Sequence, residues 1–109
     1  MFWFRASGRW RGSLAQGWGE ISRYVEVGDD QLAVRQVDVF ENGQVLRYGR
    51  EHKWDDYGML IGLKFSRKPK GARFFPDAEL ISEDDFERVW RLAEASVIWQ
   101  LQVASRRMR

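Results

Sequence analysis

An Asn-Gly pair between two apolar runs constrains the fold of this chain more than any other feature. Asn42-Gly43 separates residues 37–40 from residues 45–48, and both runs are rich in large apolar side chains. A two-residue Asn-Gly loop favours a type I′ turn, in which both central residues take positive φ. The sequence therefore predicts an antiparallel hairpin with these two residues at its tip.

Counting outward from a two-residue tip predicts the register of the hairpin. Asp38 then faces Arg47 as a cross-strand ion pair on one face of the sheet. The other face is apolar and carries Val37, Val39, Leu46 and Tyr48. Because the side-chain period of a strand is two, a slip of one residue would destroy this agreement.

Alternation and helical spacing indicate the remaining elements. We expect further strands at residues 2–6, 21–27, 31–40 and 57–65, and an edge strand at Phe74-Phe75 before Pro76. Ser82 is a candidate N-cap, and the apolar stripe after it predicts one long helix against the sheet: Phe86, Trp90, Ala93, Val97 and Leu101. The predicted fold class is α+β, an antiparallel sheet of four to five strands packed by one long C-terminal helix.

Length and composition fit a single packed domain. The chain has 109 residues, six of them Trp, and a net charge of only +2, so it is too apolar to be disordered. Residues 1–20 alternate Gly with Arg and Trp and are predicted to form an extension, which leaves residues 21–109 as the domain.

The absence of Cys excludes disulfides and thiolate metal sites. Signal peptides need apolar runs of roughly 7–15 residues and membrane spans need about 20, so we expect a cytoplasmic protein without membrane contact.

His52 is the only histidine, and it lies near Asp55 and Asp56. One hypothesis makes it a general base or a metal ligand with these carboxylates, and the other makes the segment an exposed polar loop. The sequence contains no Gly-x-Ser-x-Gly nucleophile motif and no Gly-rich phosphate loop. We therefore predict no catalytic residue, no metal, no cofactor and no enzymatic activity.

The predicted register places two arginines, Arg35 and Arg50, opposite each other at the open end of the hairpin. Directly opposed like charges destabilise a sheet unless an anion neutralises them. Acidic residues of the chain, such as Glu51 and Asp55, are one source of that anion. A carboxylate or phosphate of a bound partner is the other, which makes both arginines candidate partner-binding residues. A bulge at Gly49 would separate them instead.

A basic segment between residues 64 and 75 interleaves cations with aromatic residues. Its cations are candidate anion or nucleic-acid contacts: Lys64, Arg67, Lys68, Lys70 and Arg73. Such interleaving suits phosphate contact beside base stacking. The alternative is a solvated basic loop whose aromatic side chains point into the core.

The expected helix also carries a second apolar line, formed by Leu92, Trp99 and Val103. This line lies on the far side of the helix from the stripe that should face the sheet. An exposed line of this kind indicates a protein partner or a homodimer interface. The alternative is that the tryptophans of residues 1–20 fold over it.

Two motifs resemble a family of small, uncharacterised bacterial proteins that share a domain of unknown function. Residues 35–43 fit the family's R-x-V-x-x-F-x-x-G hairpin, and residues 81–90 fit its I-S-x-x-x-F-E-x-x-W helix start. The similarity covers roughly Tyr24 to Trp90 and leaves both ends of the chain outside it. Similar small domains occur among bacterial toxin-neutralising (immunity) proteins, which bind and mask a partner. The resemblance implies action by binding and carries over no catalytic residue.

Together these features predict a non-catalytic protein-binding module, of immunity type, in a bacterium. Its candidate contact residues are Arg35, Arg50, Leu92, Trp99 and Val103. The alternative is a nucleic-acid-binding module that uses the basic segment from Lys64 to Arg73.

Overall fold

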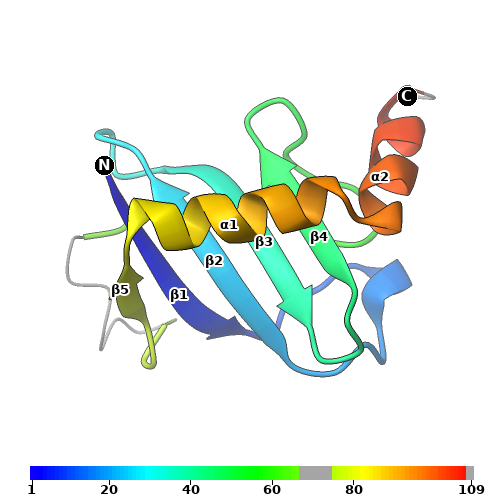
Figure 1. Cartoon of the computed structure of the whole chain (residues 1–109), viewed down its shortest axis with the longest axis horizontal. Coiled ribbons are helices and arrows are strands. Elements are labelled where there is room, and N and C mark those ends of the chain that lie inside the picture. Colours follow the sequence, from blue (N-terminus) through cyan, green and yellow to red (C-terminus); the bar gives the residue numbers. More distant parts are fainter. Residues whose placement is uncertain (67–74, 108–109) are drawn as a thin grey trace.

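The computed structural model describes residues 1–66 and 75–107, with the backbone alone for residues 105–107. Five antiparallel strands form one sheet, in the order β4-β3-β2-β1-β5 (Figure 1). The strands are β1 (Phe2–Gly8), β2 (Ile21–Val27), β3 (Ala33–Phe40), β4 (Val45–Gly49) and β5 (Glu79–Ile81). The helices are a short 3₁₀ helix η1 (Ser13–Ala15), α1 (Glu83–Glu94) and α2 (Val97–Arg107). The predicted α+β class and its antiparallel sheet are confirmed.

Residues 1–20, expected to form an extension, supply β1 to the sheet. β1 lies between β2 and β5, and Phe4 stands opposite Val25 with both side chains fully buried. Beyond the strand, the N–H of Gly12 donates to the carbonyl of Tyr57 at 2.8 Å. The first twenty residues therefore share a hydrogen-bonded sheet and a loop layer with the rest of the chain.

The hairpin tip has three residues rather than the predicted two. Gly43 alone takes positive φ, at 90°, and its N–H donates to the carbonyl of Phe40 at 2.9 Å. The next pair outward closes with the N–H of Phe40 donating to the carbonyl of Gln44 at 2.9 Å. Asn42 keeps negative φ, and its side-chain oxygen accepts from the N–H of Gln44 at 3.0 Å. This is a type I turn followed by a left-handed glycine, the other common solution for a short hairpin.

The extra tip residue moves the register by one and turns β4 over. Val37 faces Arg47 instead of Tyr48, so Arg47 shares a face with Val37 while Tyr48 points to the opposite one. The predicted Asp38–Arg47 ion pair is wrong, because Asp38 faces Leu46. The predicted opposition of Arg35 and Arg50 is wrong for the same reason: Arg35 stands opposite Gly49.

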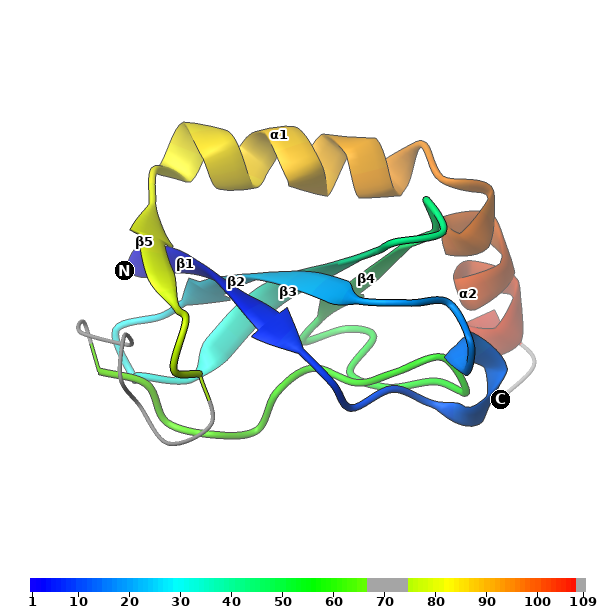
Figure 2. The same cartoon turned by 90° about the horizontal axis from the view of Figure 1, so that it is seen from below.

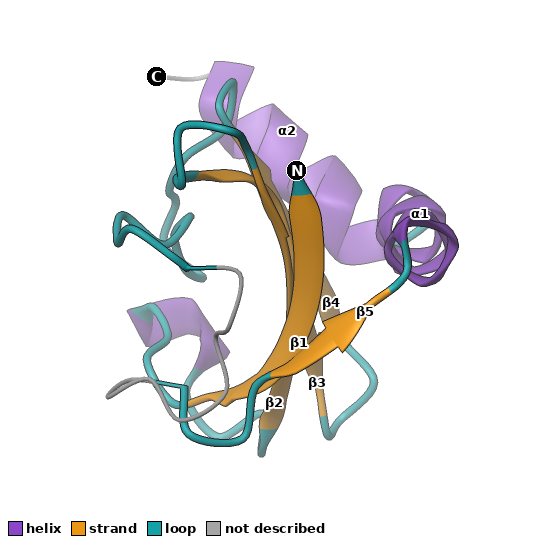
Figure 3. Ribbon diagram, turned by 90° about the vertical axis from the view of Figure 1, so that its left-hand side faces the viewer, coloured by secondary structure: helices purple, strands orange, loops and turns teal. Residues whose placement is uncertain are grey.

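Both faces of the sheet are covered, which explains why alternation did not identify the correct register. Helix α1 crosses one face, and loops with η1 cover the other (Figures 2 and 3). Under α1 the buried core consists of Val37, Val45, Phe86 and Ala93. On the opposite face the buried residues form two clusters that include Phe4, Val25, Phe65 and Phe75 in one and Ile21, Phe40, Leu46 and Tyr48 in the other. A strand buried on both faces carries no polar row to mark the outside.

The alternating segment at residues 57–65 is not a strand. Within it the structure contains only isolated bridges, Trp54 with Met59 and Leu32 with Lys64. Its alternation does not mark a buried face either, because Met59 and Leu63 share the phase of the buried Phe65 and are each 42% exposed. Phe75 forms a single bridge, whereas Phe74 lies outside the described residues. The short strand β5 was not predicted.

The C-terminal region forms two helices rather than one. Ser82 caps α1 as predicted, accepting from the N–H of Asp85. The break follows from Ser96, whose hydroxyl accepts from the N–H of Ile98 at 3.1 Å and donates to the carbonyl of Val45. That cap starts α2 in a new direction along the β4 edge of the sheet (Figure 2). Val97, expected on the buried stripe, is consequently 70% exposed.

Candidate functional site

A pocket of about 240 Å³ lies where the end of β4 meets α1 and α2. Its lining includes three arginines, two tryptophans and the single histidine: Arg35, Arg47, Arg50, His52, Trp90 and Trp99. Four elements, β3, β4, α1 and α2, and the turn after β4 contribute these side chains. Arg35, Arg50 and Trp99, named from the sequence as contact residues, therefore meet at one place.

Arg35 is fully engaged by carboxylates on both sides. Its Nε and Nη2 donate to Glu26 of β2, each at 2.7 Å, and its guanidinium also donates to Glu87 of α1. Trp3 Nε1 completes the group by donating to Glu26 at 2.9 Å. Burial alone would raise the pKa of Glu26, but the hydrogen bonds from Arg35 and Trp3 hold that pKa below its ordinary value. Arg35 thus fastens α1 to the sheet.

Arg50 has a partner that is easily replaced. Its Nη2 lies 2.9 Å from Asp30 Oδ2, and the two side chains are 51% and 50% exposed. An ion pair this exposed contributes little, roughly 0–1 kcal/mol. The charge of Arg50 is therefore balanced by Asp30, in a pair that adds little to stability.

Arg47 is the least satisfied of the three arginines. Its guanidinium carbon lies 3.6 Å from the ring centroid of Trp90 and 4.8 Å from that of Trp99. Nε and Nη1 are both buried, and neither has a hydrogen-bond acceptor within the part of the chain that the structure describes. Burial lowers the pKa of this guanidinium and the nearby Arg35 charge adds to the lowering, while Glu94 opposes it. Arginine nevertheless stays protonated near neutral pH, so the pocket contains a desolvated positive charge.

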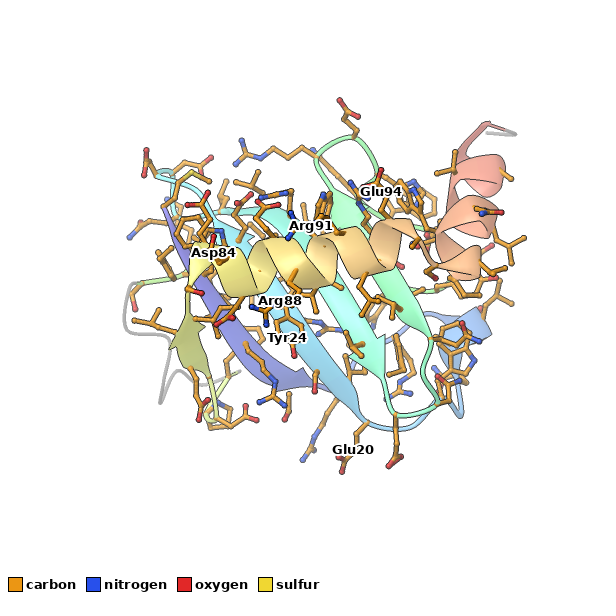
Figure 4. The ribbon with its side chains drawn as sticks, in the orientation of Figure 1. Glu20, Tyr24, Asp84, Arg88, Arg91 and Glu94 are labelled. Carbon is orange, nitrogen blue, oxygen red and sulfur yellow. The ribbon has the colours of Figure 1, made fainter. Side chains whose placement is uncertain are left out.

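Glu94 is the carboxylate at ion-pair distance from Arg47 among the described residues. Its Oε2 lies 3.4 Å from Nη1, within ion-pair range, although the geometry is not that of a hydrogen bond. The Glu94 side chain is 63% exposed, against 14% for Arg47. Figure 4 shows Glu94 at the C-terminal end of α1, on the same side of the helix as Arg91 and away from Tyr24.

His52 and Asp55 form a buried pair beside the pocket. His52 Nε2 lies 2.8 Å from Asp55 Oδ2, and the imidazole stacks on the Tyr48 ring and meets the Trp99 ring edge to face. The expectation of an exposed polar loop is therefore wrong for these two residues, whereas Asp56 is exposed.

Asp55 is the centre of a network that joins the turn, β4 and α2. It accepts from the Tyr48 hydroxyl at 2.7 Å, from Gln102 Nε2 at 2.8 Å and from two backbone N–H groups. Burial alone would raise the pKa of Asp55, but hydrogen bonds from His52, Gln102 and Tyr48 keep that pKa below its ordinary value. Burial and the Asp55 charge both raise the pKa of the Tyr48 hydroxyl, so it remains a donor.

This network supports the structure around the pocket, because Asp55 ties the turn to β4 and α2. A carboxylate beside an imidazole is the arrangement of an oriented general base. The pocket lining as described, however, contains no Ser, Thr or Cys that such a base could activate. Among the described residues, no group of three or more His, Cys, Asp or Glu side chains is placed to hold a metal ion.

Gln102 closes the open edge of the sheet. Its side-chain oxygen accepts from the N–H of Arg47 and its amide nitrogen donates to the carbonyl of Arg47, both at 3.3 Å. One side chain thereby satisfies the two backbone groups that a neighbouring strand would have paired. Gln102 is fully buried, and its polar character within an apolar helical stretch was the available sequence signal for this role.

The remaining predicted contact residues lie apart from the pocket. Leu92 is 58% exposed on α1, and Val103 is half-buried on α2. Trp18 packs on Phe40 and Tyr57 on another part of the molecule. Of the cations in the basic segment only Lys64 lies within the described residues, and it is exposed. The other four predicted contacts, Arg67, Lys68, Lys70 and Arg73, lie outside the described residues.

No protein-family model, curated protein or solved structure matches this chain. The resemblance to a bacterial family thus remains a prediction carried by its two motifs. Within residues 1–66 and 75–107, no helix has both the length and the apolar character needed to cross a membrane.

Proposed function

We propose that this chain is a non-catalytic protein-binding module, of the immunity type in its mode of action, and that the pocket beside β4 is its recognition site. One observation carries the proposal: Nε and Nη1 of the charged Arg47 are buried without a hydrogen-bond acceptor among the described residues, at the place where three predicted contact residues meet. Buried polar groups in stable proteins are almost always paired, so an exception requires an explanation. A partner that supplies the acceptors is such an explanation.

The composition of the pocket supports a protein partner. Trp and Arg are the residues most enriched at the energetic centres of protein interfaces. Here two tryptophans hold an arginine in place, which reduces the side-chain entropy lost on binding. Beside these rings Nε and Nη1 of Arg47 are buried, a condition under which a charged hydrogen bond is strong.

Gly49 offers a clean way to block the pocket without disturbing the fold. A Cβ built at Gly49 would lie 3.9 Å from Trp90 and 3.8 Å from the Val34 carbonyl, which is ordinary van der Waals contact. The Gly49→Ala variant therefore adds a methyl group to the pocket lining. Gly62→Ala is the matched control, because a Cβ there has no neighbour within 4 Å.

The experiment compares capture of a partner by these two variants. Immobilised wild-type protein is used to isolate its dominant partner from cells of its own organism, and the purified partner is then titrated against each variant. We expect Gly62→Ala to bind like wild type and Gly49→Ala to bind about tenfold more weakly, equivalent to about 1.4 kcal/mol. Equal affinities for both variants, recovery of nucleic acid alone, or association only with a second copy of this chain would overturn the proposal.

A further inference from the structure

We propose that the pocket recognises a carboxylate side chain, an Asp or Glu of the partner protein, and that Glu94 occupies its place in the free protein. This inference rests on the proposed function, since it names the chemical group that the binding module reads. It follows from the shape of the Arg47 environment, from the charge balance of the pocket and from the position of Glu94.

The tryptophan rings determine which part of Arg47 a ligand can reach. Both rings lie against the guanidinium, at 3.6 Å and 4.8 Å from its central carbon to the ring centroids. The N–H edges are what remain for hydrogen bonding, and Nε and Nη1 have no acceptor among the described residues. Both nitrogens are buried in the free protein, so a ligand reaches Nη1 only when the Glu94 side chain moves away from it. A planar carboxylate with two oxygens is the natural partner of a planar guanidinium edge.

The charge balance of the pocket favours a single negative charge. Arg35 is already balanced by two carboxylates, and Arg50 is paired with Asp30. Once Glu94 leaves, Arg47 is the one arginine of the pocket without a carboxylate at ion-pair distance in the described structure. A monoanionic carboxylate matches this charge, whereas a phosphate with up to two negative charges would remain under-neutralised.

Glu94 has the properties of an internal competitor. It lies 3.4 Å from Nη1 of Arg47 but makes no hydrogen bond to it, and most of its side chain is in water. An exposed, weakly held carboxylate is displaced at low free-energy cost. A partner carboxylate that hydrogen-bonds Arg47 would replace it. The partner's interaction with Arg47 must therefore be more favourable than that of Glu94.

The test uses a small probe that carries one side-chain carboxylate, N-acetyl-glutamate amide. It is titrated into full-length protein while the indole N–H signals of Trp90 and Trp99 are followed by NMR. The comparison probes are N-acetyl-glutamine amide, which is isosteric and neutral, and inorganic phosphate. We expect the carboxylate alone to shift both indole signals saturably, with a dissociation constant on the order of millimolar.

Removing Glu94 should tighten that binding. We expect Glu94→Gln to lower the dissociation constant of the carboxylate probe about three- to tenfold. Glu83→Gln, which removes a negative charge from the exposed first turn of the same helix, should leave it unchanged. Equal binding by Glu94→Gln and wild type, or equal binding of phosphate and carboxylate, would overturn the inference. If Gly49→Ala still weakens capture of a protein partner in that case, the binding function stands and only its carboxylate chemistry is lost.

Discussion

Two hollows in this molecule differ in the hydrogen bonding of one arginine in the lining of each, Arg23 in the larger hollow and Arg47 in the pocket beside β4. The larger hollow, about 740 Å³, lies on the loop-covered side of the sheet and includes Arg23 in its lining. Arg23 donates to both oxygens of Asp38, at 2.8 and 3.1 Å, and to the carbonyl of Trp10 at 3.0 Å. Arg47 lines the smaller hollow and lacks acceptors for two of its nitrogens within the described structure. Volume alone would favour the first hollow as a binding site. The two nitrogens of Arg47 that lack acceptors favour the second.

The surroundings of the two arginines explain what each can do. Asp38 is 1% exposed and also accepts from the amide of Gln36, so the Arg23 network is closed and already complete. The carboxylate nearest Arg47 is mostly in water. A satisfied buried charge specifies a structure, whereas an unsatisfied one beside a pocket is poised for a ligand.

The largest expected effect comes from breaking the closed pair. We expect Asp38→Ala to lower the free energy of unfolding by about 3–5 kcal/mol, because it leaves Arg23 buried without its carboxylate. Urea denaturation followed by tryptophan fluorescence measures the loss. The double variant Arg23→Met with Asp38→Leu should recover most of it, since both charges are then gone. A loss below about 1 kcal/mol in the single variant would mean that Arg23 is satisfied by other groups.

A smaller effect is expected at Asp55, which pairs with His52 beside the smaller hollow. Asp55→Asn should cost about 1–3 kcal/mol at neutral pH, since the amide cannot accept all of the hydrogen bonds that the carboxylate accepts. The folded-state pKa of Asp55 lies below the ordinary 3.8, so its stabilisation is present above that value and is lost as pH falls through the folded pKa.

The pH dependence separates the charge of Asp55 from its shape. Urea denaturation of wild type and Asp55→Asn at about pH 7 and about pH 3 gives the difference in unfolding free energy at each pH. That difference should shrink at the lower pH, where wild type begins to lose the benefit of its carboxylate. A difference independent of pH would show that the lost hydrogen-bond geometry, rather than the charge, accounts for the effect.

Local signals in the sequence predicted part of the fold correctly. The strand at residues 21–27 and the cap at Ser82 both follow from short-range rules, and both are observed. The hairpin register did not follow, because Asn42-Gly43 is compatible with a tip of two or of three residues. The choice depends on whether Asn42 takes positive φ or uses its side chain to accept from Gln44. The helix break depends likewise on Ser96 finding Val45 in space.

Only part of the candidate site could be predicted from the sequence, for a related reason. Arg35 and Arg50 were selected because a mistaken register opposed them, yet both line the pocket. Arg47 was overlooked, since the same register assigned it to Asp38, and Trp90 was assigned entirely to the core. Whether an arginine has acceptors depends on residues from distant segments, here Glu94 of α1 and the rings on two helices. No spacing rule reports that.

The smallest expected effect on stability is at Arg47, and it tests whether Arg47 differs from Arg23 in its contribution to the fold. Arg47→Met removes cation–π contacts worth about 0.5–2 kcal/mol. It also removes a desolvated charge with two unmet donors, and methionine packs well against aromatic rings. The two contributions nearly cancel, so we expect the unfolding free energy to change by less than about 1 kcal/mol in either direction.

Arg23→Met is the matched control on the other side of the sheet. It leaves the Asp38 carboxylate buried without its arginine and should lower the free energy of unfolding by about 3–5 kcal/mol under the same conditions. Arg47→Met should keep its fold and lose the NMR response to N-acetyl-glutamate amide. A loss of stability as large as that of Arg23→Met would make Arg47 a structural residue. The difference between the two hollows, and with it the reason for placing a binding site at the smaller one, would then disappear.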